Sequence, residues 1–123
     1  MIDFKNGIIK LKKTFGDVQN IQVSPLLVSG EEIISTYSAI RDYVVFTNKR
    51  LIIVNVQGMT GKKKDYSSLP YSKIQAFSVE TSGVFDLDSE LELWFSGLGR
   101  IKLEFSGNSD IVKIGQLISQ HIL

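Results

Sequence analysis

The segment Tyr43–Val54, with the sequence YVVFTNKRLIIV, decides the fold of this chain. It consists of two apolar runs of mainly β-branched and aromatic residues, which are typical of strands. The pair Asn48-Lys49 separates the runs, and a two-residue connection of this kind indicates a β-hairpin. The hairpin sets Phe46 opposite Leu51, so apolar side chains meet across it. The fold is therefore expected to be built from antiparallel strands.

Further strand-like segments lie on both sides of this hairpin. Residues 31–40 are rich in Ile, Thr, Tyr and Ser, and a glycine-containing turn at residues 57–61 leads into another strand that ends near Pro70. Residues 74–81 alternate imperfectly between apolar and polar side chains. The β core is expected over residues 31–106.

A second hairpin is expected near the end of this core. Apolar residues alternate with acidic or basic ones on both sides of residues 96–99. The apolar residues of the predicted core face are Leu87, Leu91, Leu93, Phe95, Ile101, Leu103 and Phe105. Keeping all of them on one face requires a connection with an odd number of residues.

Two registers of this hairpin satisfy that condition. One sets Glu92 opposite Lys102, and opposite charges favour it. The other places Gly99 at the left-handed position of a three-residue loop, which the conformational freedom of glycine favours. The residues alone leave both registers open.

A helix is predicted before the core. At ~100° per residue, the apolar residues of segment 3–15 fall within one narrow arc with lysines at its margins, which predicts a basic amphipathic helix. Such a helix either lies on an anionic membrane or docks on its own domain, and we expect docking.

A second helix is predicted after the core, over residues 109–122. Asn108 and Asp110 suit its start, because such side chains favour the first turn of a helix. Its apolar stripe consists of Ile111, Ile114, Leu117, Ile118 and Ile122. We expect this helix to pack on the sheet.

Composition narrows the functional classes. Lysine and arginine number 14 and aspartate and glutamate 13, a formal net charge of +1 that argues against a nucleic-acid partner. The absence of cysteine excludes a disulfide framework, a thiolate nucleophile and a cysteine-ligated zinc site, and fits a cytoplasmic location. The charged N-terminal segment predicts no secretory signal, and the apolar run Leu51–Val54 is far shorter than the ~20 residues that span a bilayer.

The arrangement of acidic, histidine and nucleophilic residues along the sequence predicts no catalytic, metal or cofactor site. The acidic residues Asp86, Asp88, Glu90 and Glu92 lack the spacing of a calcium loop and are typical of a solvated strand face. His121 is the single histidine, with no nucleophile pattern beside it, and a positive group there suits the last turn of a helix.

The run Lys62-Lys63-Lys64 is the candidate binding surface. Three adjacent ammonium groups concentrate positive potential that binds phosphate head groups or an acidic partner. Short lysine runs also serve as plain solvated surface, or protect an edge strand from unwanted pairing. No P-loop accompanies the run.

Arg41–Gly97 resembles the bacterial pleckstrin-homology-like domain family. The similar pieces are Arg41-Asp42, Phe46 to Leu51, Gly58 to Lys62, Pro70-Tyr71, Glu80 to Gly83 and Phe85 to Asp88. The resemblance implies a PH-like, partly open antiparallel barrel of about seven strands, capped by a C-terminal helix. It also implies cyclic homo-oligomers, but not the phosphoinositide site of eukaryotic pleckstrin-homology domains.

Two functional hypotheses follow for a single domain over residues 1–123. The first is a non-enzymatic scaffold that assembles with itself into a ring and presents a surface to a protein partner. The alternative is a peripheral membrane module that binds anionic lipid head groups through Lys62, Lys63 and Lys64.

Overall fold

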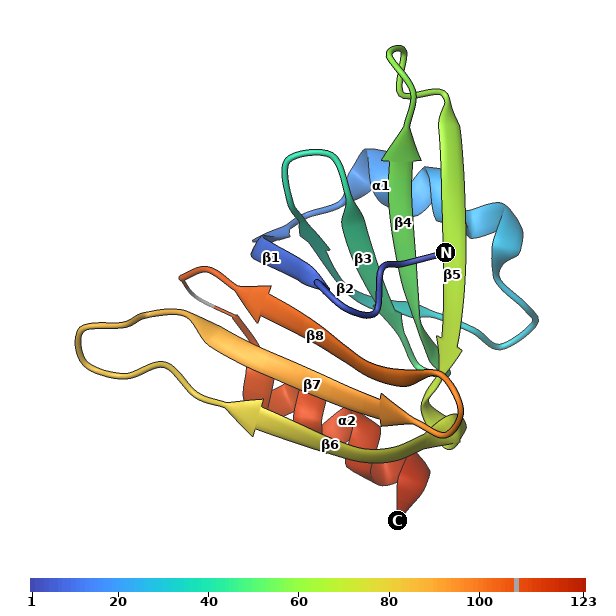
Figure 1. The fold of residues 1–123 in the computed structure, drawn as a ribbon. Coiled ribbons are helices and arrows are strands. Elements are labelled where there is room, and N and C mark those ends of the chain that lie inside the picture. The colour runs from blue at the N-terminus through green and yellow to red at the C-terminus, as the bar shows by residue number, and fades with distance from the viewer. Residues whose placement is uncertain (108) are drawn as a thin grey trace.

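The computed structural model describes residues 1–107 and 109–123. Its helices are α1 (Asp17–Val23) and α2 (Ile111–Ile122), with short 3-10 helices η1 (Ser24–Leu26) and η2 (Tyr71–Lys73). Its strands are β1 (Ile8–Thr14), β2 (Ile33–Ser38), β3 (Tyr43–Thr47), β4 (Arg50–Gln57), β5 (Lys63–Pro70), β6 (Ile74–Glu80), β7 (Ser89–Phe95) and β8 (Gly99–Phe105). They form one sheet of eight strands in the order β5-β4-β3-β2-β1-β8-β7-β6 (Figure 1).

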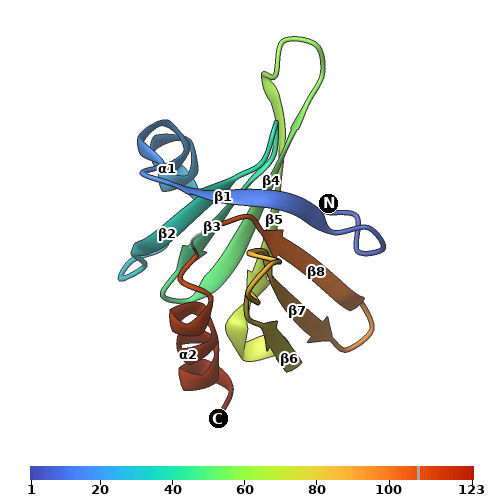
Figure 2. The same ribbon diagram turned by 90° about the vertical axis from the view of Figure 1, so that its left-hand side faces the viewer.

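The predicted fold class is confirmed, with one difference in the strands. The chain is mainly β with a helix towards each end, and the sheet is not closed, since β5 and β6 are its two edges. The structure has eight strands because the N-terminal segment contributes β1. Neighbouring strands pair antiparallel except β1 and β8, which run parallel. Figure 2 shows β1 passing between the β2–β5 half and the β6–β8 half.

The prediction of a helix over residues 3–15 is wrong, because this segment contains strand β1. Ile8 and Leu11 are buried, and their spacing of three residues also fits a helix. In the structure this three-residue spacing comes from a β-bulge. The pairing of β1 with β8 shifts register between Ile8 and Leu11, and Lys10 adopts a φ of 58°. Phe15, expected on the apolar arc, is 95% exposed.

The N-terminal helix is α1, which follows β1 and covers the outer face of β3 and β4. Val23 is fully buried there, in a cluster with Tyr43, Val45, Ile52 and Val54. This cover explains why every residue of β3 is buried, although a strand with one solvent-facing side would alternate.

The hairpin formed by β3 and β4 has the predicted register. Phe46 lies opposite Leu51, and Val44 opposite Ile53. All four side chains are fully buried in the main core.

The register of the second hairpin is the one that charge favours. Glu92 lies opposite Lys102 across β7 and β8, and residues 96–98 form the connection. The ion pairs themselves run diagonally, from Arg100 to Glu92 at 3.7 Å and from Lys102 to Glu90 at 3.3 Å. Leu91 and Leu93 are fully buried on the other face, as predicted.

The main core lies between the two halves of the sheet. Tyr37 packs edge-on against Phe46 and Phe105, with ring centroids 5.9 and 4.8 Å apart. The predicted C-terminal helix is present as α2, which lies beside β6, β7 and η2 and buries Ile111, Ile114 and Ile118. The predicted helix-start residue Asn108 is outside the described residues, and the side chain of Asp110 makes no capping hydrogen bond.

A buried ion pair ties the loop before β2 to the β3–β4 hairpin. Both Glu31 carboxylate oxygens accept hydrogen bonds from Arg50, at 2.9 Å from Nε and 3.0 Å from Nη2. Thr47 Oγ1 and the Val28 N–H donate to the same carboxylate, whose side chain is 0% exposed. Burial alone would raise the pKa of Glu31, but these hydrogen bonds outweigh it and lower the pKa to about 2.

The burial of Leu93 predicts a large cost for its truncation. Leu93→Ala should lower the free energy of unfolding by about 2 to 5 kcal/mol, because it removes buried methyl groups and leaves a cavity. Denaturant melts measure this value. The matched control is Leu98→Ala, at a position that is 52% exposed, which should cost less than about 0.5 kcal/mol. Equal losses in the two variants would contradict the assigned core face.

The Glu31 ion pair predicts acid sensitivity. The pKa of Glu31 is about 2 in the folded state against an ordinary 4.5, so its stabilising contribution is complete above pH 4.5 and disappears as the pH falls towards 2. Glu31→Gln should cost on the order of 3 kcal/mol at pH 7, because it leaves Arg50 without its buried counter-ion. The difference between wild type and variant should shrink between pH 4.5 and 2.5 in denaturant melts. A difference independent of pH would contradict this assignment.

Candidate functional site

The turn between β4 and β5 presents the predicted lysines to solvent. The Gly61 N–H donates to the Gly58 carbonyl at 3.3 Å, and both glycines have positive φ, which closes the turn. Lys62 and Lys63 are exposed, and neither forms an ion pair with any described residue. Lys64 differs, because it is half-buried and its Nζ donates to the Gly61 carbonyl at 3.1 Å. The three lysines are therefore not equivalent.

The turn between β2 and β3 adds a further cation to this surface. Arg41 donates from Nη2 to the Gly58 carbonyl, so its guanidinium lies against the β4–β5 turn. Next to it, the Asp42 carboxylate accepts the Val56 N–H at 3.1 Å and so ties the β2–β3 turn to the end of β4. The sequence pattern did not predict Arg41 as a site residue. Arg41 and Gly58 are far apart in the sequence, and no pattern of neighbouring residues indicates that their two turns meet.

Two fully exposed apolar side chains accompany these cations. Ile40 precedes Arg41, and Met59 lies in the β4–β5 turn beside Gly58. We call the set of Ile40, Arg41, Met59, Lys62 and Lys63 the basic tip. The basic tip is the candidate binding surface of the chain, because it combines positive charge with exposed apolar side chains.

The connection between β6 and β7 has the opposite charge. Residues 83–88 hold a turn in which the Gly83 N–H donates to the Asp86 carbonyl at 2.7 Å. The Asp86 carboxylate accepts the Asp88 N–H at 3.0 Å. Val84 and Phe85 are almost fully exposed. We call residues 83–88 the acidic loop.

The prediction that Leu87 lies on the core face is wrong. Leu87 is 62% exposed, because β7 begins only at Ser89 and the alternating pattern does not extend into the acidic loop as regular strand. Of the four acidic residues expected on a solvated face, Asp86 and Asp88 are exposed, whereas Glu90 and Glu92 are partly buried and form ion pairs with Lys102 and Arg100.

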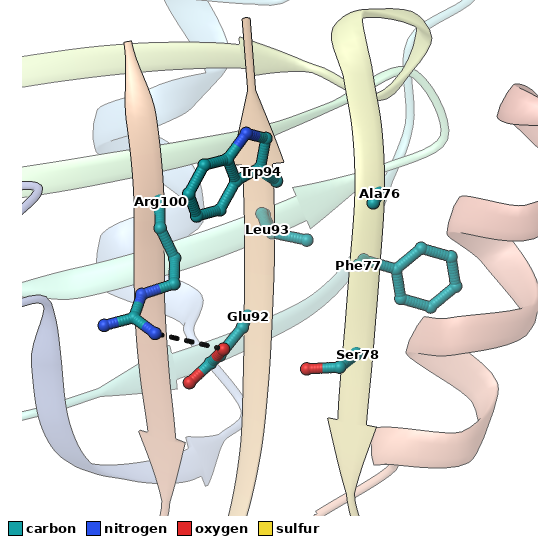
Figure 3. A pocket seen from close by; sticks show the side chains of 7 residues that line it. All are labelled: Ala76, Phe77, Ser78, Glu92, Leu93, Trp94 and Arg100. Carbon is teal, nitrogen blue, oxygen red and sulfur yellow. Dashed lines mark ion pairs between the residues drawn. The ribbon is translucent and has the colours of Figure 1, made fainter.

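A shallow hollow lies on the outer face of the sheet near edge strand β6. It has a volume of about 210 Å³, and Figure 3 shows the Trp94 ring and the Arg100–Glu92 ion pair beside β6. Ala76 lies opposite Trp94, and Ser78 opposite Glu92. These small side chains on β6 leave the half-exposed indole uncovered at the sheet edge.

A groove lies on the other side of the same edge strand, between β6 and α2. Its volume is about 630 Å³, and Phe77, Val79, Val112 and Gly115 contribute to its lining. A Cβ at Gly115 would approach Val79 to 3.3 Å, so glycine lets the helix lie close to β6. Edge strand β6 thus has open space on both of its faces.

The remaining candidate residues of the sequence form neither a catalytic nor a metal site within the described parts of the chain. The His121 ring lies 5.2 Å from that of Tyr71, and its Nδ1 is 2.9 Å from the Leu117 carbonyl within the same helix. Among residues 1–107 and 109–123, no group of three histidine or carboxylate side chains is placed to hold a metal ion. No helix in the same ranges has the length and apolar character that crossing a bilayer requires.

Comparison with known families identifies the fold. The family described as bacterial PH domain matches residues 4–122, nearly the entire chain. The chain belongs to the bacterial PH domain family. The match includes β1 and α2, and it points to no enzymatic family.

Two relatives of this bacterial PH domain come from Bacillus subtilis strain 168. Uncharacterized protein YjqA is 43% identical over 100 residues, which cover 80% of each chain. Uncharacterized protein YozO is 35% identical over 101 residues, which cover 82% of this chain and 87% of that protein.

Solved structures support the same assignment. A protein with a pleckstrin-homology domain from Shewanella loihica PV-4 is 40% identical, with a TM-score of 0.78 over 94% of this chain and 99% of that chain. A pleckstrin homology domain from Shewanella amazonensis SB2B is 41% identical, with a TM-score of 0.65 over 89% of this chain and 90% of that chain. The resemblance seen in the sequence is therefore confirmed.

Proposed function

We propose that this bacterial PH domain is a cytoplasmic, non-enzymatic interaction module that assembles with copies of itself and offers the assembled surface to a protein partner. The observation that carries this proposal is the pair of free sheet edges, β5 and β6. An edge strand exposes a row of unpaired backbone N–H and C=O groups, which pair readily with a strand of another chain.

The residues of β6 support this role. The strand Ile74–Glu80 contains no proline or lysine, the residues that commonly protect an edge from unwanted pairing. Apolar side chains lie near both of its faces, with the half-exposed Trp94 on one side and Phe77 and Val79 in the groove along α2 on the other. An edge strand that lacks both residues and has an exposed aromatic side chain beside it suits strand addition, whereas the other edge, β5, carries Lys63, Lys64 and Pro70.

The two edges also constrain the symmetry of an assembly. Because β5 and β6 are different surfaces, a contact between the β5 edge of one copy and the β6 edge of the next is head-to-tail. Such contacts close into a ring when the rotation per copy allows it, and the ring has more than two copies unless that rotation is 180°. This expectation agrees with the cyclic assembly that the family resemblance implies.

The proposal predicts the mass of the protein in solution. Static light scattering behind a sizing column should give a mass above twice the 13.8 kDa of one chain at micromolar concentration. A monomer mass across this range would contradict self-assembly. A dimer mass would contradict a ring of more than two copies.

A second candidate function is the binding of anionic lipid head groups by the basic tip. The observation that favours it is Arg41, which joins Lys62 and Lys63 through its hydrogen bond to Gly58. Lysine and arginine near an anionic membrane each contribute about 1 kcal/mol of attraction, which salt screens.

Vesicle sedimentation separates the two functions. Our proposal predicts that the protein stays in solution with both phosphatidylserine-containing and neutral phosphatidylcholine vesicles at low salt. The control protein carries Arg41→Ala, Lys62→Glu and Lys63→Glu. Sedimentation of wild type with the anionic vesicles only, lost in this variant and at high salt, would favour the lipid function instead.

A further inference from the structure

We infer that the pocket between β1, β2 and α2 binds a small aliphatic carboxylate, a ligand with a single negative charge and a short apolar chain. The pocket has a volume of about 290 Å³, close to the lower limit of the ~300–1,000 Å³ that small-molecule sites occupy. Its lining residues belong to neither of the edge strands β5 and β6, so the inference is independent of the proposed self-assembly. Figure 2 shows the beginning of α2 close below the beginning of β2.

A β-bulge in β2 shapes one wall of this pocket. The pairing of β2 with β3 passes from Ile33 opposite Thr47 to Ser35 opposite Phe46, so Ile34 is the extra residue. In a regular strand Ile33 and Ser35 would share a face. Here Ile33 packs with the cluster under α1, whereas Ile34 and Ser35 both line the pocket. The bulge thus presents an apolar side chain and a hydroxyl to the same space.

Helix α2 completes the apolar part of the pocket. Ile114 and Leu117 lie about one helical turn apart and contribute to the lining. Ile114 is buried and Leu117 half-buried, while Ile34 across from them is 54% exposed. A short aliphatic chain between these three side chains would leave water on most of its surface, which is the main source of affinity for such a ligand.

Two lysines stand at the polar end of the pocket. Lys13 lies opposite Tyr37 in the pairing of β1 with β2, so the two side chains share a face. Its ammonium forms an ion pair with Asp110 at the start of α2, which uses one of its three N–H donors. Lys113 is exposed and forms no ion pair with any residue of the ranges 1–107 and 109–123.

The charges of this polar end favour a ligand with one negative charge. The hydrogen bond from Lys13 holds the pKa of the Asp110 carboxyl below its usual range, and the positive charge of Lys113 acts in the same direction. Asp110 is therefore ionised at neutral pH, and two lysines against one carboxylate leave a surplus of one positive charge. A ligand carboxylate beside Lys113 balances this surplus, and the Ser35 hydroxyl is a further hydrogen-bond donor in the same pocket.

The strands beside the pocket disfavour an extended peptide as the ligand. β1 pairs with β2 and β8, and β2 pairs with β1 and β3. Neither strand is a sheet edge, so neither offers the row of free backbone groups that a peptide needs to add as a further strand. A small molecule held by side chains does not need such a row.

Isothermal titration calorimetry of the full chain tests the ligand class with three probes. Sodium octanoate, kept below its micelle concentration, should bind saturably with about one molecule per chain. Sodium acetate, which has the same head group without the chain, should bind at least about tenfold more weakly. Octyltrimethylammonium, which has the same chain with a positive head group, should not bind.

Two variants and a matched control test the location. Lys113→Glu should weaken octanoate binding by about tenfold or more, because a charge-assisted contact is replaced by like-charge repulsion. Ile34→Ser should weaken it several-fold, because the apolar wall is lost. The control Lys62→Glu makes the same charge change on the basic tip and should keep the wild-type affinity. Thermal melts and light scattering should show that all three variants keep the fold and the mass of the wild type.

The other outcomes would overturn the inference. Equal losses in Lys113→Glu and Lys62→Glu, or equal binding of octanoate and the octyl cation, would contradict a specific carboxylate site in this pocket. Tighter binding of an acetylated peptide that ends in leucine would assign the pocket to the C-terminus of a protein partner. Absence of octanoate binding would remove the inference and leave self-assembly intact, because the wild-type mass tests that proposal separately.

Discussion

The structure depends on the hydrogen bonding of β1 to two strands from different halves of the chain. Residues 12–14 pair antiparallel with β2, and Ile8 and Leu11 pair in parallel with β8. The pairing joins β2–β5 and β6–β8 into one sheet with a common core. The backbone just before β1 must approach β8 closely. A Cβ on Gly7 would lie 2.0 Å from the Lys102 carbonyl oxygen, so this position requires glycine.

The position of β1 also determines where the sheet remains unpaired. With β1 in the middle, the free edges are the consecutive strands β5 and β6, which the short helix η2 joins. Each edge leads at its far end to an exposed charged segment, the basic tip on β5 and the acidic loop on β6. The same topology that builds the core thus places the opposite charges of these two segments at different ends of the molecule.

Local patterns predicted most of the fold and two of the five residues of the basic tip. The two hairpins and the apolar stripe of α2 follow from contacts between residues close in sequence, so alternation and turn length suffice. Lys62 and Lys63 were identified for the same reason, as adjacent residues after a turn. Segment 3–15 was misassigned because a bulge shifts the strand pattern by one residue and produces a helical spacing of apolar side chains.

The sequence by itself determined the family, the strand-forming segments after residue 30, the core faces of β7 and β8 and the charge of each turn, because these properties belong to single residues or near neighbours. Only the tertiary structure decided that Arg41 contacts the β4–β5 turn, that β1 lies between β2 and β8, and that β5 and β6 form the edges. These features depend on pairing between residues far apart in the chain, where the hydrogen-bonding groups of any strand are alike. Which strands pair is then settled by how the whole core packs.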